Sequence, residues 1–178
     1  MNRYNDCLPL ILKHEGGKVD DPADKGGRTS CGITQRTYDS WRKTIGMQPK
    51  DVWEITPTEI SAIYRTRYWA PCGAQLLPEP LDMIVFDTAV LFGPRRAVMF
   101  LQIALGMPSA ECDGVCGQHT AAHASESDTA HQTDWVGRRI IDQREAYHRA
   151  RVANDPTQER FLAGWLARCD DLRKLVQI

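Results

Sequence analysis

The chain has 178 residues, of which 42% are hydrophobic and 25% are charged, and its formal net charge at pH 7 is −1. These fractions are ordinary for a globular protein of one domain, or of two small domains packed together. The near-zero charge excludes a global basic field, and no apolar run approaches the ~20 residues of a membrane-spanning helix, so neither nucleic acid nor a membrane is an expected partner.

The first predicted element is a helix that begins near residue 5 and ends at Glu15. The residues that share one face with Glu15 at i, i+3, i+4 spacing are Tyr4, Leu8, Ile11 and Leu12. Gly16-Gly17 follows directly, as glycine does just past a helix C-terminus. Residues 18–30 then carry turn signals such as Asp-Asp-Pro and Asp-Lys-Gly-Gly, which predict an irregular loop or a short hairpin.

The rest of the chain is predicted to be helical. Its strongest start signal is Thr56-Pro57-Thr58-Glu59, which combines a Thr cap, a Pro at the first helical position and a Glu for a capping box. Periodicity and Pro or Gly boundaries predict helices over 33–46, 57–70, 78–93, 94–106, 133–152 and 157–176. Residues 113–120 are expected to form a glycine-rich loop. The predicted fold class is mainly α, with at most a small β-hairpin near the N-terminus.

Glu15 carries the most chemical information in the sequence. It continues the apolar stripe of the first helix, so its carboxyl is expected to point toward the interior or a cleft. Burial and the negative end of the helix macrodipole both disfavour the ionised form. A carboxyl that stays protonated near neutral pH can act as a general acid, although a glutamate at a helix end is more often a solvated side chain.

Asp24 and Thr29 follow in the glycine-rich segment. Asp24 precedes Gly26-Gly27 in a polar loop and is expected to stay ionised, and two carboxyls in contrasting environments are typical of glycoside hydrolysis. The Thr29 hydroxyl can help to hold a water molecule. If the pair serves a water, the two carboxyls should lie roughly 6.5–9.5 Å apart and the reaction inverts the anomeric carbon. For Asp24 alone, an Asx turn is the simpler interpretation.

Residues 14–34, HEGGKVDDPADKGGRTSCGIT, resemble the signature of glycoside hydrolase family 108. Members of that family are N-acetylmuramidases, among them phage endolysins and lysozyme-like proteins linked to secretion. The Glu…Asp…Thr order is also similar to the catalytic constellation of phage-type lysozymes. Further along, TPTEISAIYRTRYWAP resembles the family's second helix, and FDTAVLFGPRRAVMFLQIALG, CDGVCGQHT and RFLAGWLARCDDL resemble an accompanying peptidoglycan-binding segment.

This resemblance implies a lysozyme-like helical fold. Residues 1–93 would form the muramidase catalytic region and residues 94–178 a helical peptidoglycan-binding region, packed with the first as one globule. The implied reaction is hydrolysis of the β-1,4 bond between N-acetylmuramic acid and N-acetylglucosamine, with Glu15 protonating the glycosidic oxygen and Asp24 and Thr29 positioning the water. The expected partner is peptidoglycan, the expected oligomeric state is a monomer, and no cofactor is expected.

Substrate-binding residues are expected in two places. Gly27 belongs to the motif that matches the family, and Tyr68 and Trp69 are the aromatics we favour for stacking on sugar rings. Aromatics at helical spacing are more often core residues. Arginine side chains can also meet the lactyl or peptide carboxylates of peptidoglycan, although solvated helix faces are the simpler interpretation; the candidates are Arg65, Arg67, Arg95 and Arg96.

The six cysteines are expected to be free and mostly buried thiols. One group permits a tetrahedral zinc site, because its spacing is C-x3-C-x2-H-x3-H; its members are Cys112, Cys116, His119 and His123. The middle spacing is far shorter than in a usual zinc finger. The family pattern instead places a turn and a helix cap there, so no metal is expected.

The N-terminus lacks a basic region followed by a long apolar segment, so an ordinary secretory signal is not expected. A muramidase made in the cytoplasm that acts on the cell wall in the periplasm needs another release route, such as a holin. Two alternatives stay open at this point. The chain can be a peptidoglycan-binding module that no longer cleaves, or a component of a phage tail or of a secretion system.

Overall fold

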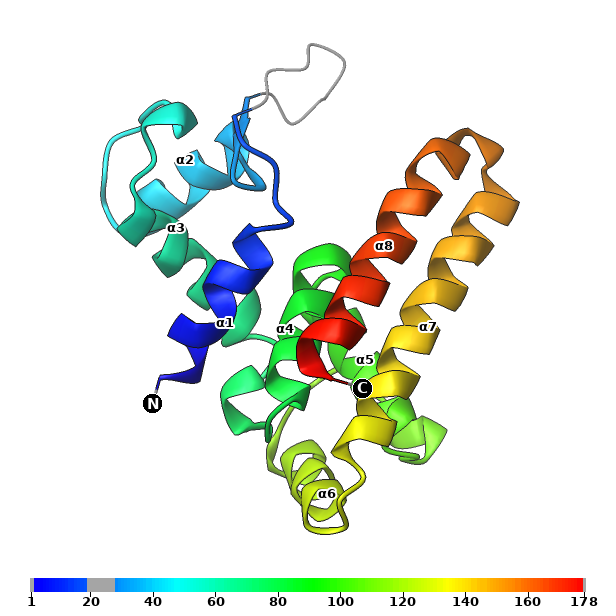
Figure 1. Cartoon of the computed structure of the whole chain (residues 1–178). Coiled ribbons are helices and arrows are strands. Elements are labelled where there is room, and N and C mark those ends of the chain that lie inside the picture. Colours follow the sequence, from blue (N-terminus) through cyan, green and yellow to red (C-terminus); the bar gives the residue numbers. More distant parts are fainter. Residues whose placement is uncertain (1, 19–27, 178) are drawn as a thin grey trace. The chain divides into compact units, whose positions relative to one another are not determined.

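The computed structural model of the chain describes residues 2–18 and 28–177 (Figure 1). The chain divides into two compact units, Met1–Arg67 and Tyr68–Ile178. Within the described residues there are eight α-helices and one antiparallel sheet of two short strands. The predicted fold class, mainly α with a small hairpin near the N-terminus, is therefore confirmed.

The first unit contains three α-helices and the hairpin. In chain order the elements are α1 (Arg3–Leu12), β1 (Thr29–Ser30), β2 (Ile33–Thr34), α2 (Gln35–Thr44), the 3-10 turn η1 (Val52–Glu54) and α3 (Pro57–Tyr64). The predicted apolar stripe of α1 is buried at Tyr4, Leu8 and Ile11. The Tyr4 hydroxyl donates a hydrogen bond to the backbone oxygen of Ser61 at 2.5 Å, which ties α1 to α3.

α3 begins where the sequence predicts, whereas α2 begins at Gln35, two residues later than predicted, because Ile33 and Thr34 form β2. At α2, the Thr34 hydroxyl accepts the Thr37 N–H at 3.2 Å. At α3, the Thr56 hydroxyl accepts the Glu59 N–H at 3.3 Å, and Glu59 Oε2 accepts the Thr56 N–H at 2.9 Å. This reciprocal pair is the predicted capping box, and it satisfies backbone donors that would otherwise lack partners.

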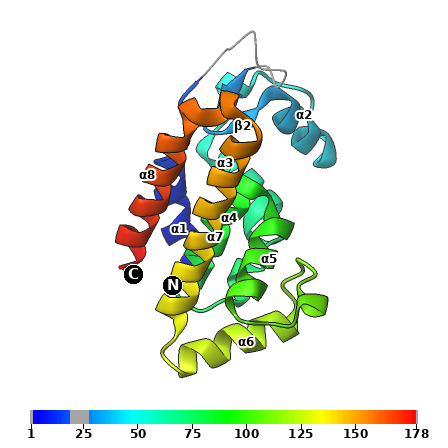
Figure 2. The same ribbon diagram turned by 90° about the vertical axis from the view of Figure 1, so that its right-hand side faces the viewer.

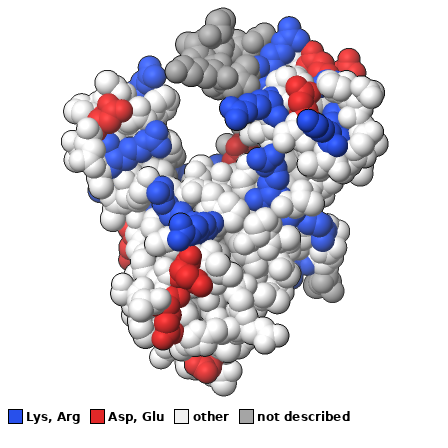
Figure 3. Space-filling model, turned by 180° about the vertical axis from the view of Figure 1, so that it is seen from behind, with Lys and Arg blue, Asp and Glu red and all other residues white. Residues whose placement is uncertain are grey.

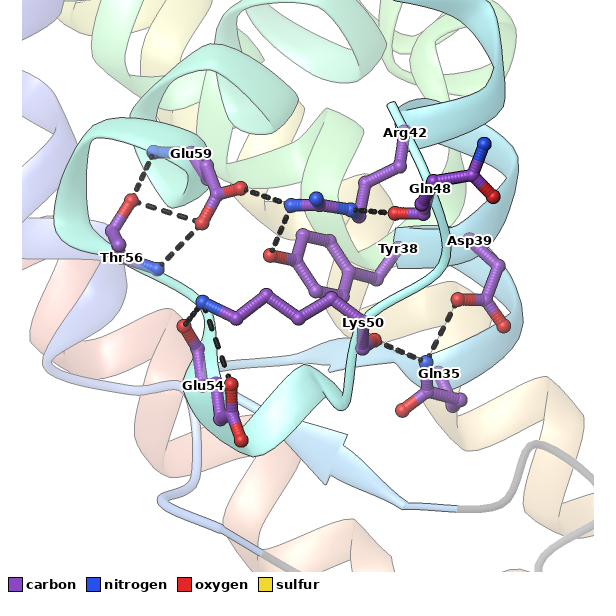
Figure 4. A network of polar contacts seen from close by, with 9 residues as sticks. All are labelled: Gln35, Tyr38, Asp39, Arg42, Gln48, Lys50, Glu54, Thr56 and Glu59. Atoms are coloured by element: carbon purple, nitrogen blue, oxygen red, sulfur yellow. Dashed lines mark hydrogen bonds and ion pairs between the residues drawn. The ribbon is translucent and has the colours of Figure 1, made fainter. Parts of the chain in front are cut away.

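A polar network holds α2 and the segment after it against α3 (Figure 4). Arg42 Nη1 lies 2.7 Å from Glu59 Oε1, and Arg42 Nε donates to the Gln48 carbonyl at 2.5 Å. Gln35 Nε2 donates to the Lys50 carbonyl at 2.8 Å. Because these contacts join α2, the following loop and the start of α3, they fix the frame that carries the hairpin.

The second unit is a group of five helices: α4 (Leu81–Phe92), α5 (Pro94–Ala104), α6 (Gln118–Thr129), α7 (Thr133–Asn154) and α8 (Glu159–Val176). α4 packs against α5 and α7, and α7 and α8 lie side by side (Figure 2). All residues from Leu81 to Ala89 are buried. α4 is therefore the central helix of the unit, as its nearly continuous apolar sequence predicts.

The structure also differs from the sequence-based prediction at α1 and α6. α1 ends at Leu12, so Glu15 lies in the turns that follow the helix and not in its last turn. The sequence predicts a loop over 113–120 and no element over 121–132, whereas Gln118–Thr129 form α6, a helix that buries only small side chains at Thr120, Ala124 and Ser127. The boundary between the two compact units lies between residues 67 and 68, because α4 packs with α5 and α7 and so belongs to the second unit. The division into two functional regions after residue 93 stays a prediction.

A buried ion cluster joins three helices of the second unit. Asp87 Oδ2 of α4 lies 2.8 Å from Arg144 Nη1 of α7, and Asp87 Oδ1 accepts a hydrogen bond from Arg168 Nη2 of α8 at 2.9 Å. The Asp87 and Arg144 side chains are only 2% and 0% exposed. Burial by itself raises the pKa of Asp87, but the two guanidinium groups outweigh it and hold the pKa below its ordinary value. Asp87 is therefore a charged residue in the core.

All six cysteines are among the described residues and are free thiols, and Cys7, Cys72 and Cys169 are buried. Burial raises the pKa of Cys72 to about 12 and that of Cys116 to about 11. Because the thiolate is the reactive form of cysteine, both side chains are chemically quiet at neutral pH.

The surface carries charges of both signs. On the face shown in Figure 3, lysine and arginine side chains lie among aspartate and glutamate side chains. This mixture agrees with the net charge of −1. Among the described residues, no helix combines the length and the apolar character that a membrane span requires.

Candidate active site

Glu15 lies in the turns that continue from the C-terminus of α1. The Glu15 N–H donates to the Leu12 carbonyl at 3.2 Å, and the His14 N–H donates to the Ile11 carbonyl at 3.0 Å. Ile11 is fully buried, whereas Glu15 is partly exposed. The anchored helix therefore delivers the Glu15 carboxyl to the border between the core and the solvent.

The hairpin formed by β1 and β2 is the second part of the site. Its register pairs Thr29 with Thr34 and Ser30 with Ile33. Ser30 and Ile33 are both buried, while Thr29 and Thr34 are partly exposed, as the two-residue alternation of a strand requires. The hairpin therefore has one face in the core and carries Thr29 on the other.

The turn of this hairpin consists of Cys31 and Gly32. Both have positive φ, at 49° and 72°. A two-residue turn with positive φ at both central positions has the geometry of a type I′ turn, which matches the twist of paired strands. Glycine adopts this conformation without strain, whereas a residue with a side chain does so at a cost.

Gly32 lies directly against the Glu15 carboxyl. A Cβ placed on Gly32 would lie 2.5 Å from Glu15 Oε2 and 2.9 Å from the Tyr64 hydroxyl. Both distances are shorter than any normal contact to a Cβ. The absence of a side chain at residue 32 therefore allows the turn, the carboxyl and the tyrosine hydroxyl to meet.

Tyr64, at the end of α3, holds the turn in place. Its side chain is 1% exposed, and its hydroxyl donates to the Cys31 carbonyl at 2.9 Å. This hydrogen bond holds the carbonyl group of Cys31, a residue of the turn whose φ is positive. Three segments that are distant in sequence thus converge on the Glu15 carboxyl: the end of α1, the hairpin turn and α3.

Comparison with known proteins gives two family models on consecutive parts of the chain. Residues 8–93 match the model described as Glycosyl hydrolase 108, and residues 96–170 match the model described as Predicted Peptidoglycan domain. The solved structure titled "Structure of Brucella abortus SagA" is 30% identical, with a TM-score of 0.78, and the match covers 98% of this chain and 94% of that chain. The chain belongs to the glycosyl hydrolase 108 family. No curated protein matches it.

Membership of the glycosyl hydrolase 108 family supports a glycosidase, and the peptidoglycan domain supports peptidoglycan as its substrate or partner. Glu15, Gly32 and Tyr64 all lie within the residues that the glycosyl hydrolase 108 model matches. The geometry around Glu15 therefore belongs to the part of the chain that carries the family's chemistry.

A substitution at Gly32 tests whether the turn positions the Glu15 carboxyl. In Gly32→Ala we expect ~1–2 kcal/mol loss of stability from the left-handed backbone, and a roughly 10²-fold loss of glycosidase activity because the new methyl group displaces the carboxyl. Melting temperature and the lysis rate of purified protein measure the two effects. The matched control is Gly46→Ala, because Gly46 also has positive φ, at 74°, but has nothing within 4 Å of its Cβ position. Equal activity losses in both variants would contradict the positioning role.

The structure describes only some of the predicted site residues. Asp24 and Gly27 lie outside the described residues. Thr29 is the first residue of β1, on the hairpin whose turn meets Glu15. Arg28 immediately precedes it, and its Nη1 lies 2.6 Å from Asp51 Oδ2. The start of the hairpin is therefore tied to the segment that leads into η1.

The aromatic residues predicted to bind sugar belong to the second unit or to the core. Tyr68 is partly exposed. Trp69 is 4% exposed and packs edge-to-face against Phe86, with ring centroids 5.1 Å apart, which favours a packing role for its ring. Tyr64 is buried and acts through its hydroxyl, at the turn described above.

The four residues with zinc-like spacing have other partners. The Cys116 thiol faces the Gly73 carbonyl at 3.9 Å, and the Cys112 thiol faces the Pro108 carbonyl at 3.6 Å. His119 Nδ1 lies 3.7 Å from Glu111 Oε2. Among the residues that the structure describes, no group of three or more His, Cys, Asp or Glu side chains is placed to hold a metal ion.

Proposed function

We propose that the chain is an N-acetylmuramidase that hydrolyses the β-1,4 bond between N-acetylmuramic acid and N-acetylglucosamine in peptidoglycan. The observation that carries the proposal is the packing around Glu15, where a glycine turn and a buried tyrosine hydroxyl meet one carboxyl at the border with solvent. A carboxyl held in this way can be presented to a glycosidic oxygen without a large reorganisation.

In the proposed reaction, Glu15 donates its proton to the glycosidic oxygen as the bond to the anomeric carbon breaks. The transition state resembles an oxocarbenium ion, and general acid catalysis of this kind contributes about 10²–10⁴-fold. Asp24 and Thr29 position the water that attacks the opposite face of the sugar. Thr29 has the right neighbourhood for this role, because it lies on the hairpin whose turn contacts Glu15.

Lysis of permeabilised Gram-negative cells, followed as loss of turbidity, tests the proposed function. A muramidase lowers the turbidity at nanomolar to micromolar enzyme, whereas a peptidoglycan-binding module without activity sediments with the cell walls and leaves the turbidity unchanged. Binding without any lysis would contradict the proposal and favour the non-catalytic alternative.

The role of Asp24 makes a stereochemical prediction. If Asp24 and Thr29 serve a water, the β-linked substrate yields the α-anomer as the first reducing sugar. Proton NMR during the first minutes of hydrolysis distinguishes the anomers before they equilibrate. An initial β-anomer would show retention, and Asp24 would then have to act as a nucleophile or to have no direct part.

A further inference from the structure

A hollow lies at the junction of α4 and α5, away from Glu15 in sequence and within the second unit. It has a volume of about 330 Å³ and is lined by Phe92, Gly93, Pro94, Arg95, Arg96 and Met99. Its size is at the lower end of pockets that bind small molecules, and its lining combines apolar side chains with two cations.

Both arginines are held in place by neutral oxygen atoms. Arg95 Nε donates to the Asp113 carbonyl at 3.3 Å, and Arg96 Nη1 donates to the Tyr147 hydroxyl at 2.6 Å. The Arg96 guanidinium also lies over the Tyr147 ring, 4.6 Å from its centroid. In the described part of the chain, neither guanidinium lies within 4 Å of a carboxylate, whereas Arg144 has Asp87 as its counterion. The nearest charge effect comes from Asp113, whose pKa is lowered chiefly by a hydrogen bond from Gln102 and to a smaller extent by the charge of Arg95.

The aliphatic part of the Arg95 side chain packs against the loop that contains Gly114. A Cβ on Gly114 would lie 2.5 Å from Arg95 Cγ and 3.1 Å from Met99 Cγ, and Gly114 has φ of +77°. The Gly114 N–H in turn donates to Gln102 Oε1 of α5 at 2.9 Å. Arg95 is therefore an ordered side chain at the rim of the hollow, although it is exposed to solvent.

The helix macrodipole opposes these two cations. Arg95 and Arg96 lie in the first turn of α5, where the helix macrodipole is positive, and cations there are unfavourable by about 0.3–1 kcal/mol each. An anion in the hollow would offset this repulsion and would supply a carboxylate at ion-pair distance from the guanidinium groups. A guanidinium group matches the geometry of a carboxylate, to which it can donate two parallel hydrogen bonds.

We propose that this hollow binds a carboxylate of the peptidoglycan stem peptide. This rests on the proposed function only in taking peptidoglycan as the polymer. The glycan backbone is largely uncharged, whereas the stem peptides carry free carboxylates beside small apolar groups. Phe92, Pro94 and Met99 offer an apolar wall for those groups. Arg96 and Tyr147 lie within the residues that match the peptidoglycan domain.

Cosedimentation with purified cell-wall sacculi tests the proposal. All proteins carry Glu15→Gln so that the polymer stays intact, and each is measured on intact sacculi and on sacculi whose free carboxylates have been converted to amides with a carbodiimide and ammonia. We expect Arg95→Gln/Arg96→Gln to bind intact sacculi at least about ten-fold more weakly, as the loss of a charge-assisted hydrogen bond implies, and to bind amidated sacculi as the parent does.

The matched control is Arg138→Gln/Arg149→Gln, which removes the same charge from two exposed arginines of α7. If both double variants lose affinity equally, the effect is one of net charge and the proposal is wrong. Arg95→Lys/Arg96→Lys keeps the charge but not the planar fork, so it should bind with intermediate affinity. Parental affinity of Arg95→Gln/Arg96→Gln for intact sacculi, with parental melting temperature, would also contradict the proposal.

The same design separates the inference from the proposed function. With Glu15 restored, turnover of amidated sacculi by Arg95→Gln/Arg96→Gln should equal turnover by the protein without the arginine substitutions, because the hollow acts on the free carboxylate of the stem peptide. A chain that never cleaves glycan but shows the affinity difference would contradict the muramidase proposal alone. A chain that cleaves glycan without the affinity difference would contradict the carboxylate site alone.

Discussion

Glu15→Gln is expected to lower the rate of cell-wall lysis by about 10²–10⁴-fold while the protein folds normally. The amide has nearly the shape of the carboxyl, so its packing against Gly32 can persist. It has no proton that it can transfer to a glycosidic oxygen. Turbidity loss gives the rate, and the melting temperature checks that the fold is unchanged.

The control for this variant is Glu54→Gln, at an exposed glutamate of the same unit. Glu54 Oε2 lies 3.5 Å from Lys50 Nζ and its side chain is 65% exposed, so the pair contributes little to stability. Lysis by Glu54→Gln should match the parent protein. Near-parental lysis by purified Glu15→Gln would remove Glu15 from the mechanism, whatever the other site residues do.

Asp87→Ala is expected to cause the largest loss of stability. The substitution removes the carboxylate that pairs with Arg144, whose side chain is fully buried, and removing one partner of a buried ion pair typically costs about 3–5 kcal/mol. For a chain of this size the melting temperature should fall by roughly 6–20 °C. Thermal unfolding followed by circular dichroism measures the shift.

An exposed ion pair of α8 provides the control. Asp171 Oδ1 lies 3.7 Å from Lys174 Nζ, with side chains that are 53% and 77% exposed, so Asp171→Ala should change the stability by less than about 1 kcal/mol. Similar shifts in the two variants would mean that the Asp87 cluster contributes no more than a surface pair.

The Asp87 cluster also predicts how stability depends on pH. The pKa of Asp87 is below its ordinary value of 3.8 in the folded chain, so its contribution is complete above that value and is lost as the pH falls through the folded pKa. His148 acts in the same direction: burial and the nearby Arg144 and Arg151 lower its pKa to about 4, so acid favours the unfolded chain. The stability gap between the parent and Asp87→Ala should therefore narrow in strong acid.

Local signals in the sequence predicted the local structure well. The capping box at Thr56 and Glu59 depends on residues that are adjacent on one helix turn, and it forms as expected. The sequence of α4 is apolar on all sides, so it predicts a helix that is buried all round, and residues 81–89 are all buried. α6 has no large apolar stripe, so periodicity gave no signal, and it is held as a helix by the burial of small side chains.

The site was predictable only in part. The sequence makes Glu15 a candidate because it follows an apolar stripe and precedes a glycine pair. The positions of Gly32 and Tyr64 could not be found in this way, because their contacts join segments far apart in the sequence. A Cys-Gly pair between two short segments of β-branched or polar residues is a weak signal for a turn with positive φ. This signal predicts the turn but not its contacts with Glu15 and Tyr64.

A muramidase is defined by the bond that it cleaves, and analysis of the reducing ends identifies that bond. Sacculi are digested with the purified protein, the products are reduced with borohydride, and the terminal sugar alcohols are identified by mass spectrometry. We expect muramitol, from N-acetylmuramic acid, at the new ends after digestion with the parent protein and not after digestion with Glu15→Gln. Glucosaminitol ends, or soluble products without any new reducing end, would contradict the proposed function.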